Sequence, residues 1–242
     1  MISPNGIKSI LFDLDGTLRH HTPTGSDVFN HYALSLGIHL DSEDRARAAR
    51  WEHYYFANSP EIRVDKQKYI SQKFEHDSFW INFGRRRLIV LGCSPAQAEE
   101  LAPQFSAHMA ENYKPQVHVP EEASAMLTKL KEAGYILGMV SNRDTSFDDE
   151  LKEMGLREFF HFTLAAGEVN SYKPDRAIFE EAVKRAGTSA SETMYVGDNY
   201  FADIVGSRRA GLQPVLYDPT RLFPDVDCHV ITVFDQILDI LK

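Results

Sequence analysis

The stretch KSILFDLDGTLRH, from Lys8 to His20, decides the fold. It begins with an apolar run that ends at Phe12, and two carboxylates, Asp13 and Asp15, follow it with one leucine between them. A short apolar run bounded by polar residues predicts a buried strand. Residues i and i+2 of a strand project to the same face, so both carboxylates are candidates for one polar site, unless the turn at Gly16 redirects Asp15.

Beyond residue 115 the chain alternates apolar strands with helices of roughly 10 to 12 residues. The predicted strands are 7–12, 135–140, 160–165, 194–196, 214–217 and 230–233, and the predicted helices are 120–134, 145–154, 175–186 and 201–210. This alternation indicates βαβ units. The sequence therefore predicts an α/β fold, with a Rossmann-like parallel sheet core flanked by helices.

Residues 20–112 break that alternation, because helical periodicity dominates them and no strand is predicted. The predicted helices are 27–36, 43–57, 67–83 and 95–109, and Ser94-Pro95 makes a good N-cap and first-turn pair. The simplest interpretation is an inserted all-helical domain at 20–112, with 1–19 and 113–242 forming the α/β core.

Composition narrows the classes of partner. The chain has 242 residues and a formal net charge of −9, which disfavours nucleic acid as a partner. No apolar run approaches the roughly 20 residues that span a bilayer, and no cleavable leader is evident. The two cysteines, Cys93 and Cys228, form no CxxC pair and are expected to be thiols of a reducing compartment. We expect a cytoplasmic protein without membrane partners, either a monomer or a weak dimer.

Four polar clusters follow the predicted strands or lie in the loops between elements. They are Asp13-Leu-Asp15-Gly-Thr17, Ser141-Asn142, Lys173-Pro174 and Gly197-Asp198 with Asp203. Each cluster also has a purely structural interpretation: Asp-Gly is a common hairpin turn, Ser-Asn and Lys-Pro are ordinary loop dipeptides, and Asp198 would make a helix cap. In a parallel sheet, however, ligands bind at the carboxyl ends of the strands.

Taken together and in this order, the four clusters resemble the motifs of the haloacid dehalogenase (HAD) superfamily of phosphoryl-transfer enzymes. The resemblance covers the whole predicted core, and the helical insert is similar to that family's helical (C1-type) cap domain. It implies an aspartyl-phosphate mechanism in which Asp13 is the nucleophile. Asp15 would protonate the leaving alcohol and then deprotonate water, which calls for a pKa above its ordinary value of about 3.9.

The resemblance also implies the remaining roles. The implied phosphate-binding residues are Thr17, Ser141, Asn142 and Lys173, with Thr17 directed to the phosphate or to Asp15. The implied metal ligands are Asp13, Asp198, the backbone carbonyl of Asp15 and, through water, Asp203. Charge balance supports a cation, because a phosphate against a carboxylate at ~4 Å costs about 4 kcal/mol per pair of unit charges at an effective dielectric of 20. Mg²⁺, which prefers oxygen ligands, is the expected cofactor.

The function that these roles imply is a Mg²⁺-dependent phosphatase acting on a small phosphorylated metabolite, either a nucleoside monophosphate or a sugar phosphate. Four alternatives remain open: a phosphomutase of the same superfamily, a carbon-halogen dehalogenase, a phosphonate hydrolase with a Schiff-base lysine (Lys66, Lys68 or Lys73), and a non-catalytic phosphate- or partner-binding module. The pair of acids and Asp198 argue against a dehalogenase, which needs neither a metal nor Asp15.

Some side chains in or near the insert are weaker candidates. His20 and His21 stand where the core meets the insert, and Arg85, Arg86 and Arg87 could neutralise an anionic substrate, although a solvated helix face is the simpler interpretation. Trp51, Tyr54 and Tyr55 are expected to be core packing rather than a stacking site. The predicted cap is expected to open and close through residues 18–22 and 110–115.

Overall fold

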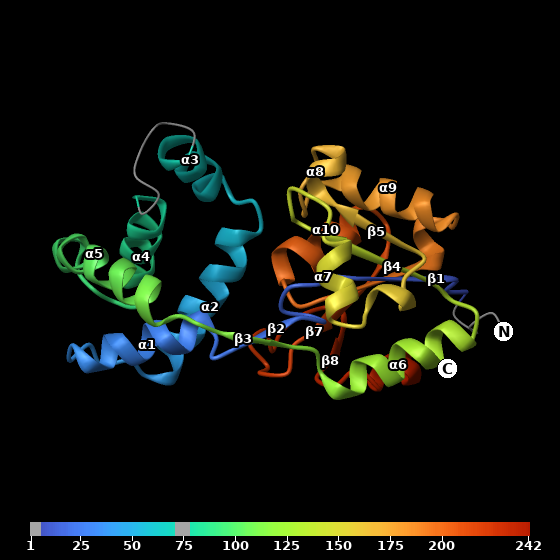
Figure 1. Cartoon of the computed structure of the whole chain (residues 1–242), viewed down its shortest axis with the longest axis horizontal. Coiled ribbons are helices and arrows are strands. Elements are labelled where there is room, and N and C mark those ends of the chain that lie inside the picture. The colour runs from blue at the N-terminus through green and yellow to red at the C-terminus, as the bar shows by residue number, and fades with distance from the viewer. Residues whose placement is uncertain (1–5, 71–77) are drawn as a thin grey trace. The chain divides into compact units, whose positions relative to one another are not determined.

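The core of the molecule is a six-stranded parallel sheet in the order β5-β4-β1-β6-β7-β8 (Figure 1). The structure is a computed structural model, and it describes residues 6–70 and 78–242. The strands are β1 Ser9–Phe12, β4 Ile136–Ser141, β5 Phe162–Ala165, β6 Thr193–Gly197, β7 Gln213–Tyr217 and β8 His229–Ile231. The predicted α/β class is confirmed.

Strand β1 lies at the centre because both of its faces are apolar. It pairs in parallel with β4 on one side and β6 on the other, and all four of its residues are buried. Ile10 and Phe12 belong to one hydrophobic cluster, and Leu11 belongs to a second cluster on the opposite face. A strand that is covered on both faces reads as a continuous apolar run, which is why this segment was recognisable from the sequence.

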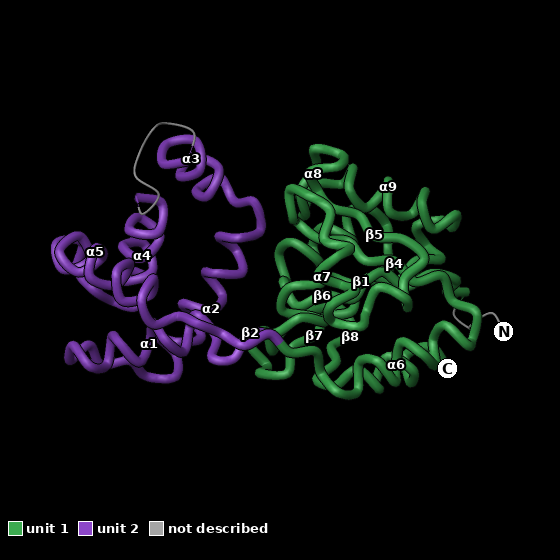
Figure 2. Tube along the Cα trace, viewed as in Figure 1, with its two compact units in different colours: residues 1–20, 118–242 green, residues 21–117 purple. Residues whose placement is uncertain are grey.

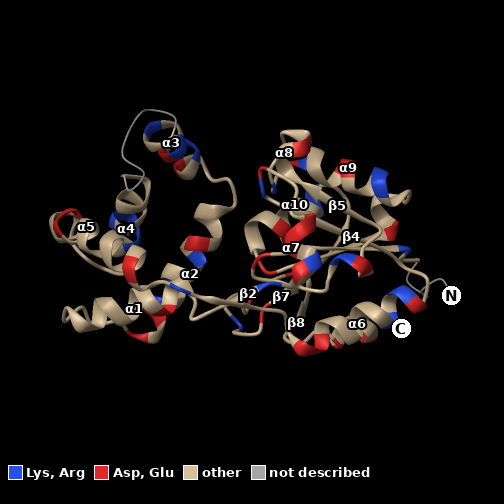
Figure 3. Ribbon diagram, in the orientation of Figure 1, with Lys and Arg blue, Asp and Glu red and all other residues tan. Residues whose placement is uncertain are grey.

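Helices cover both faces of this sheet, with α6 on one side and α9 on the other (Figure 1). The helices of this unit are α6 Glu121–Glu132, α7 Asp148–Glu153, α8 Ala166–Val169, α9 Arg176–Ala186, α10 Gly206–Arg209 and α11 Gln236–Ile240. Helix α6 carries acids in its first turn and lysines in its last turn, an arrangement that favours the helix dipole (Figure 3). Gly187 ends α9 in the left-handed conformation, with φ of 68°.

A second compact unit comprises residues 21–117, and the first comprises 1–20 with 118–242 (Figure 2). The boundaries expected from the sequence were 19/20 and 112/113. The helices of the second unit are α1 Gly25–Ser35, α2 Ser42–Phe56, α3 Pro60–Tyr69, α4 Ser78–Val90 and α5 Pro95–Asn112. Capping boxes at Thr24, Asp41 and Ser94 begin α1, α2 and α5, so the local sequence sets where these helices start.

The two chain segments that join the units pair with each other as a separate two-stranded sheet, β2 (His20–Thr22) with β3 (Gln116–His118). Neither strand was predicted. Three residues are too few to show a period of two, and the partners lie about a hundred positions apart, so no local signal reveals them.

Two helix predictions were wrong in detail. A single helix was expected over 67–83, but α3 ends at Tyr69 and α4 begins at Ser78, and residues 71–77 lie outside the described part of the chain. An α-helix was expected over 201–210, whereas Tyr200–Val205 is a π-helix that continues into α10. The Asn199 side chain accepts from the N–H groups of Phe201 and Ala202 at its start. A π-turn of this kind is frequent at functional sites.

Cys93 and Cys228 are both free thiols, as expected. Within residues 6–70 and 78–242, no helix is at once long and apolar enough to cross a membrane.

Candidate active site

Three neighbouring strands end at one polar site. Asp13 directly follows β1, Ser141 is the last residue of β4, and Asp198 directly follows β6. Because β4, β1 and β6 are adjacent and parallel, their carboxyl ends meet at one edge of the sheet. The Asp13 N–H donates to the carbonyl of Val196 at 2.9 Å, which extends the β1–β6 pairing and fixes the start of the loop. Asp13 and Ser141 are buried.

Lys173 joins this site from the loop between α8 and α9. Its Nζ lies 2.5 Å from Asp13 Oδ1, 2.7 Å from Asp203 Oδ1 and 3.0 Å from the Tyr195 hydroxyl. The side chain is only 3% exposed. An ammonium group has three protons to donate, and these three contacts use all of them. The lysine is therefore a fixed positive charge against the proposed nucleophile.

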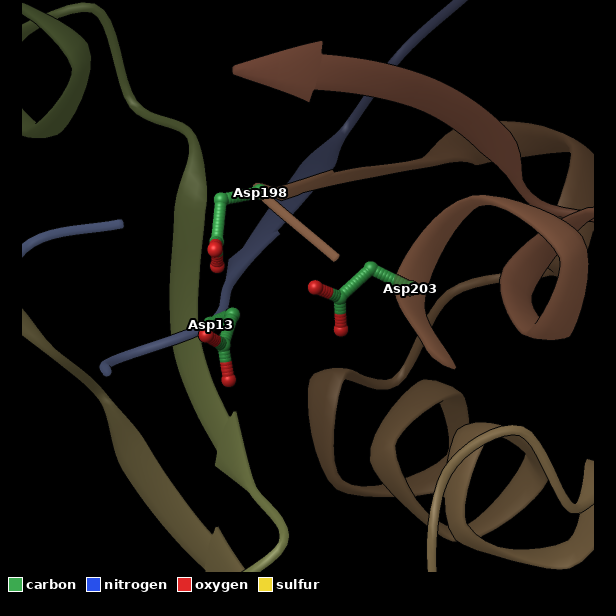
Figure 4. A group of neighbouring side chains, drawn as sticks. All are labelled: Asp13, Asp198 and Asp203. Atoms are coloured by element: carbon green, nitrogen blue, oxygen red, sulfur yellow. The ribbon is translucent and has the colours of Figure 1, made fainter. Parts of the chain in front are cut away.

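Asp13, Asp198 and Asp203 form an acidic cluster that could hold a metal ion. Each offers a carboxylate oxygen within 4.8 Å of the others, and Figure 4 shows the three carboxylates turned toward one another from β1, the end of β6 and the π-helix. Three hard oxygen donors suit a divalent cation such as Mg²⁺. Buried Asp13 and Asp203 and half-buried Asp198 outnumber the one lysine beside them. A cation would offset the excess negative charge, so these residues fit the implied ion.

Burial dominates the ionisation of this cluster. Burial raises the pKa of Asp13 to about 7; the Lys173 ammonium opposes the shift, and the carboxylate of Asp203 adds to it. Burial, together with the charges of Asp13 and Asp203, also raises the pKa of Asp198 well above its ordinary value. Burial disfavours the charged form of Lys173, but Asp13 and Asp203 outweigh it and raise the pKa of the lysine. In the metal-free site the lysine is charged, and burial favours the protonated forms of Asp13 and Asp198.

The raised pKa of Asp13 predicts a pH-dependent stability. A carboxyl whose pKa is 3.8 when unfolded and about 7 when folded stabilises the fold fully below 3.8, and this contribution is lost as the pH rises through about 7. We expect the melting temperature of the chelator-treated protein to fall from about pH 5 to about pH 8 more steeply than that of Asp13→Asn, which lacks this proton. Mg²⁺ should raise the melting temperature more at the upper end, since it binds deprotonated ligands. Parallel pH curves for the two proteins would contradict the assignment.

Thr17 and Gly16 shape the place of Asp198. The Thr17 hydroxyl donates to Asp198 Oδ1 at 3.1 Å and accepts from the Asp198 N–H at 3.0 Å, so it contacts a metal-ligand candidate rather than Asp15. Gly16 has a φ of +94°, and a Cβ there would lie 2.4 Å from Asp198 Oδ2. Glycine at position 16 therefore leaves room for the Asp198 carboxylate beside the loop that follows β1, and the Thr17 hydroxyl holds that carboxylate in place.

Asn142 holds Lys173 in place. Its Nδ2 donates to the Lys173 carbonyl at 2.9 Å, and its Oδ1 accepts from the Lys173 N–H at 2.6 Å. The side-chain amide of Asn142, which was expected to contact phosphate, therefore hydrogen-bonds to both the carbonyl and the N–H of Lys173. Gly197 leaves room for the side chain of Asp203 in the same way as Gly16 does for Asp198. A Cβ on Gly197 would lie 2.4 Å from the carboxylate carbon of Asp203.

Asp15 departs from the expectation for a general acid. Its side chain is 41% exposed and forms ion pairs with Arg19 and Arg143. Burial alone would raise its pKa, but the hydrogen bonds and charges of the two arginines outweigh burial and lower it. The general-acid role that the resemblance implies calls for a raised pKa, whereas the pKa of Asp15 is lowered in this conformation. Arg19 lies in the turn after the two acids, and Arg143 lies just beyond the end of β4. The two acids and the glycine by themselves therefore did not indicate that either arginine would pair with Asp15.

Three functional residues escaped the sequence reasoning: Tyr195, Arg19 and Arg143. The Tyr195 hydroxyl accepts from Lys173 Nζ and donates to the Val140 carbonyl at 3.2 Å. A tyrosine in the middle of an apolar strand reads as core. Arg143 directly follows Ser141-Asn142, and that position was the available signal.

Several weaker candidates have structural roles in the described residues. Arg87 is buried, pairs with Glu52 at 2.9 Å and lies over the Phe29 ring, so a solvated face is wrong for it. Arg86 pairs with buried Asp65 at 2.7 Å. Arg85, by contrast, is half-buried and lies 3.7 Å from the exposed Glu99.

The aromatic and histidine candidates pack against their neighbours. Trp51 stacks on Tyr55 and on Phe83, and the Tyr55 ring lies tilted against Phe83, as expected of core residues. Tyr54 donates to Glu61 at 2.8 Å. His20 Nε2 lies 2.7 Å from the Thr17 carbonyl.

His20 also stacks on His118, with ring centroids 5.4 Å apart, and His21 is half-buried in β2.

The lysines that a phosphonate hydrolase would need lie in the second unit. Lys66 and Lys68 are exposed on α3, and Lys73 lies outside the described residues.

Comparisons with known proteins identify the family of the chain. The family model of haloacid dehalogenase-like hydrolases matches residues 10–216. A ribulose-1,5-bisphosphate 5-phosphatase from Halopiger xanaduensis is 28% identical over 220 residues, which cover 88% of this chain and 85% of that protein. A phosphoserine phosphatase from Thermus thermophilus is 27% identical over 228 residues, covering 88% and 89%.

Solved structures share the fold. A 2-haloacid dehalogenase from Pseudomonas syringae superposes with a TM-score of 0.55 at 24% identity, covering 97% of this chain and 98% of that one. At this identity the likeness shows the fold alone. The family match spans β1 through β7, and the four motifs fall within it, so the chain belongs to the haloacid dehalogenase-like hydrolase family, as the sequence indicated.

Proposed function

We propose that the protein is a Mg²⁺-dependent phosphatase that hydrolyses a small phosphate monoester through an aspartyl-phosphate on Asp13. The observation that carries the proposal is the buried convergence of Asp13, Lys173 and Asp203 within hydrogen-bonding distance, with Asp198 completing the acidic cluster. A nucleophilic carboxylate, a fixed cation and a set of metal ligands at one strand end are the parts that phosphoryl transfer needs.

Two displacements at phosphorus make up the proposed reaction. In the first, an Asp13 oxygen bonds to phosphorus, the bond to the ester oxygen breaks, and Asp15 gives its proton to the leaving alcohol. In the second, water attacks the same phosphorus, Asp15 takes the proton of that water, and Asp13 leaves as a carboxylate with inorganic phosphate as product. Splitting one displacement into two lowers each barrier. The carboxylate form of Asp15 in this structure is the form that the second step uses.

The remaining residues stabilise charge. Lys173 places its ammonium group against Asp13 and would meet the phosphoryl oxygens, while Ser141 at the end of β4 would donate to them. Asn142 positions that lysine, and Thr17 positions Asp198. A Mg²⁺ ion held by Asp13, Asp198 and the Asp15 carbonyl, with Asp203 through water, would supply positive charge that offsets the repulsion between phosphate and nucleophile.

The substrate class rests on two relatives that match over more than four fifths of their length, a ribulose-1,5-bisphosphate 5-phosphatase and a phosphoserine phosphatase. We propose a small phosphorylated metabolite, with sugar phosphates and nucleoside monophosphates as the two classes to test, in a cytoplasmic enzyme. The helical unit, residues 21–117, is the proposed cap domain that selects among them. Acidic and basic residues are interspersed over both units, so the distribution of charge does not favour nucleic acid (Figure 3).

A panel assay tests this function. Purified protein is offered sugar phosphates, nucleoside monophosphates, phosphoserine and p-nitrophenyl phosphate, and free phosphate is measured with Mg²⁺ and with chelator. We expect release from at least one ester with Mg²⁺ and a loss of at least roughly tenfold with chelator. Release of phosphate from none of them would refute the proposal. An isomerised sugar phosphate would identify a mutase instead, and metal-independent halide release from a haloacid would identify a dehalogenase.

A further inference from the structure

Two arginines clamp the carboxylate of Asp15. Arg143 donates from Nε to Oδ2 at 3.0 Å and from Nη2 to Oδ1 at 3.1 Å, and Arg19 donates from Nη1 to Oδ1 at 2.6 Å. Both carboxylate oxygens are therefore engaged, and the contact with Arg143 is bidentate. A bidentate guanidinium fixes the plane and the direction of a carboxylate, which a single ammonium contact does not.

The Arg143 side chain is itself anchored. Its Nη1 donates to Glu150 of α7 at 2.5 Å, and its guanidinium lies 5.6 Å from the ring centre of Phe147. Its carbonyl accepts from the Gly167 N–H at 3.1 Å. A Cβ on Gly167 would lie 1.9 Å from the carbonyl oxygen of Asp144, so only glycine allows this segment to approach so closely. Arg143 is thus anchored by contacts with two other segments, the start of α7 and α8.

The charges of this group favour positioning over substrate binding. Arg19 and Arg143 carry two positive charges, and Asp15 and Glu150 carry two negative charges, so the network has no net charge with which to attract an anion. An isolated exposed ion pair contributes little to stability. The ion pairs of Arg19 and Arg143 matter for another reason, because their shared partner Asp15 is the proposed acid–base residue.

We infer that Arg143 is a positioning residue that, with Arg19, holds the Asp15 carboxylate in the single orientation from which it takes the proton of the attacking water. The inference rests on the proposed function and names the step on which the arginine acts, the hydrolysis of the aspartyl-phosphate. A displacement of about 1 Å at such a group can cost 10²-fold in rate, so the clamp affects turnover even though Arg143 touches no reacting atom.

The test uses Arg143→Lys, which keeps the charge and loses the bidentate contact, with p-nitrophenyl phosphate and Mg²⁺. The nitrophenolate leaves without a proton, so only the second step depends on Asp15. We expect kcat to fall about 10- to 100-fold, kcat/KM to stay within about twofold, and the phosphoenzyme trapped by acid quench to accumulate. Glu150→Gln, which loosens the anchor, should show the same pattern at smaller size.

Arg176→Lys is the matched control, because Arg176 is 66% exposed and its only ion pair among the described residues is with Glu180 one turn along α9, at 2.6 Å. It should behave as wild type. If Arg143→Lys lowers kcat/KM and leaves kcat unchanged, the arginine binds substrate and the inference fails; unchanged kinetics in both Arg143→Lys and Glu150→Gln also overturn it. A wild-type protein that forms no phosphoenzyme and releases no nitrophenol refutes the proposed function, and the inference with it.

Discussion

Asp13→Asn is expected to lower phosphate release by at least roughly 10³-fold, the largest effect of any single substitution in the site. An amide of the same size occupies the same place after β1 but neither attacks phosphorus nor leaves as a carboxylate. The substitution also removes one oxygen anion from the acidic cluster and the ionic partner of Lys173 Nζ, 2.5 Å away. Chemistry and metal binding should therefore fail together, while the fold, whose core lies behind the strand ends, should remain.

The measurement is phosphate release in the panel assay together with acid-quench trapping of ³²P-labelled protein. Labelled protein should form with wild type and be absent with Asp13→Asn. Asp235→Asn is the control, because Asp235 is 58% exposed and pairs only loosely with Lys129, at 3.4 Å. Equal phosphate release from Asp13→Asn and wild type would show that another group accepts the phosphoryl unit. A label that persists in Asp13→Asn would place the covalent intermediate elsewhere.

Lys173→Met is expected to lower the free energy of unfolding of the metal-free protein by about 3–5 kcal/mol, because removing one partner of a buried ionic contact strands the other. Here the stranded groups are Asp13 and Asp203, which lie 2.5 and 2.7 Å from the ammonium. The hydroxyl of Tyr195 loses its donor as well. Activity should fall by about 10²–10³-fold, since the positive charge that would face the phosphoryl oxygens is gone.

Chemical denaturation with chelator present, followed by the panel assay with Mg²⁺, separates the two effects. Lys184→Met is the matched control: Lys184 is 79% exposed, pairs with Glu181 at 3.2 Å and should cost no more than about 0.5 kcal/mol. An unchanged unfolding free energy in Lys173→Met would mean that the ammonium group does not stabilise the two carboxylates that it contacts. Full activity would remove the lysine from the mechanism.

The parts of the molecule that local chemistry dictates were predictable from the sequence. Strand β1 is apolar from Ile10 to Phe12 because both its faces are covered, and its end is marked by two acids and a glycine. Ser94 and Pro95 predicted the start of α5, and the structure confirms it. The family was predictable because four short motifs follow one another in order along the whole core.

What the sequence could not show depends on contacts between distant segments. The pKa of Asp15 is lowered because Arg143 comes from the end of β4, 128 positions away. Arg87 reads as part of a solvated basic run, yet the fold buries it against Glu52, 35 residues earlier by number. Tyr195 reads as core because only its hydroxyl is polar. In each case the deciding partner is supplied by tertiary packing, which periodicity does not encode.

The pairing of β2 with β3 has an evolutionary consequence. The chain leaves the core at His20 and returns at His118, and these two points are joined as neighbours in one small sheet. The inserted segment, residues 21–117, therefore has its two ends next to each other. Its length and sequence can change without moving β1 or β4. Evolution can exchange or enlarge this segment, and so change which substrate is selected, while the candidate active site at the strand ends of the core stays intact.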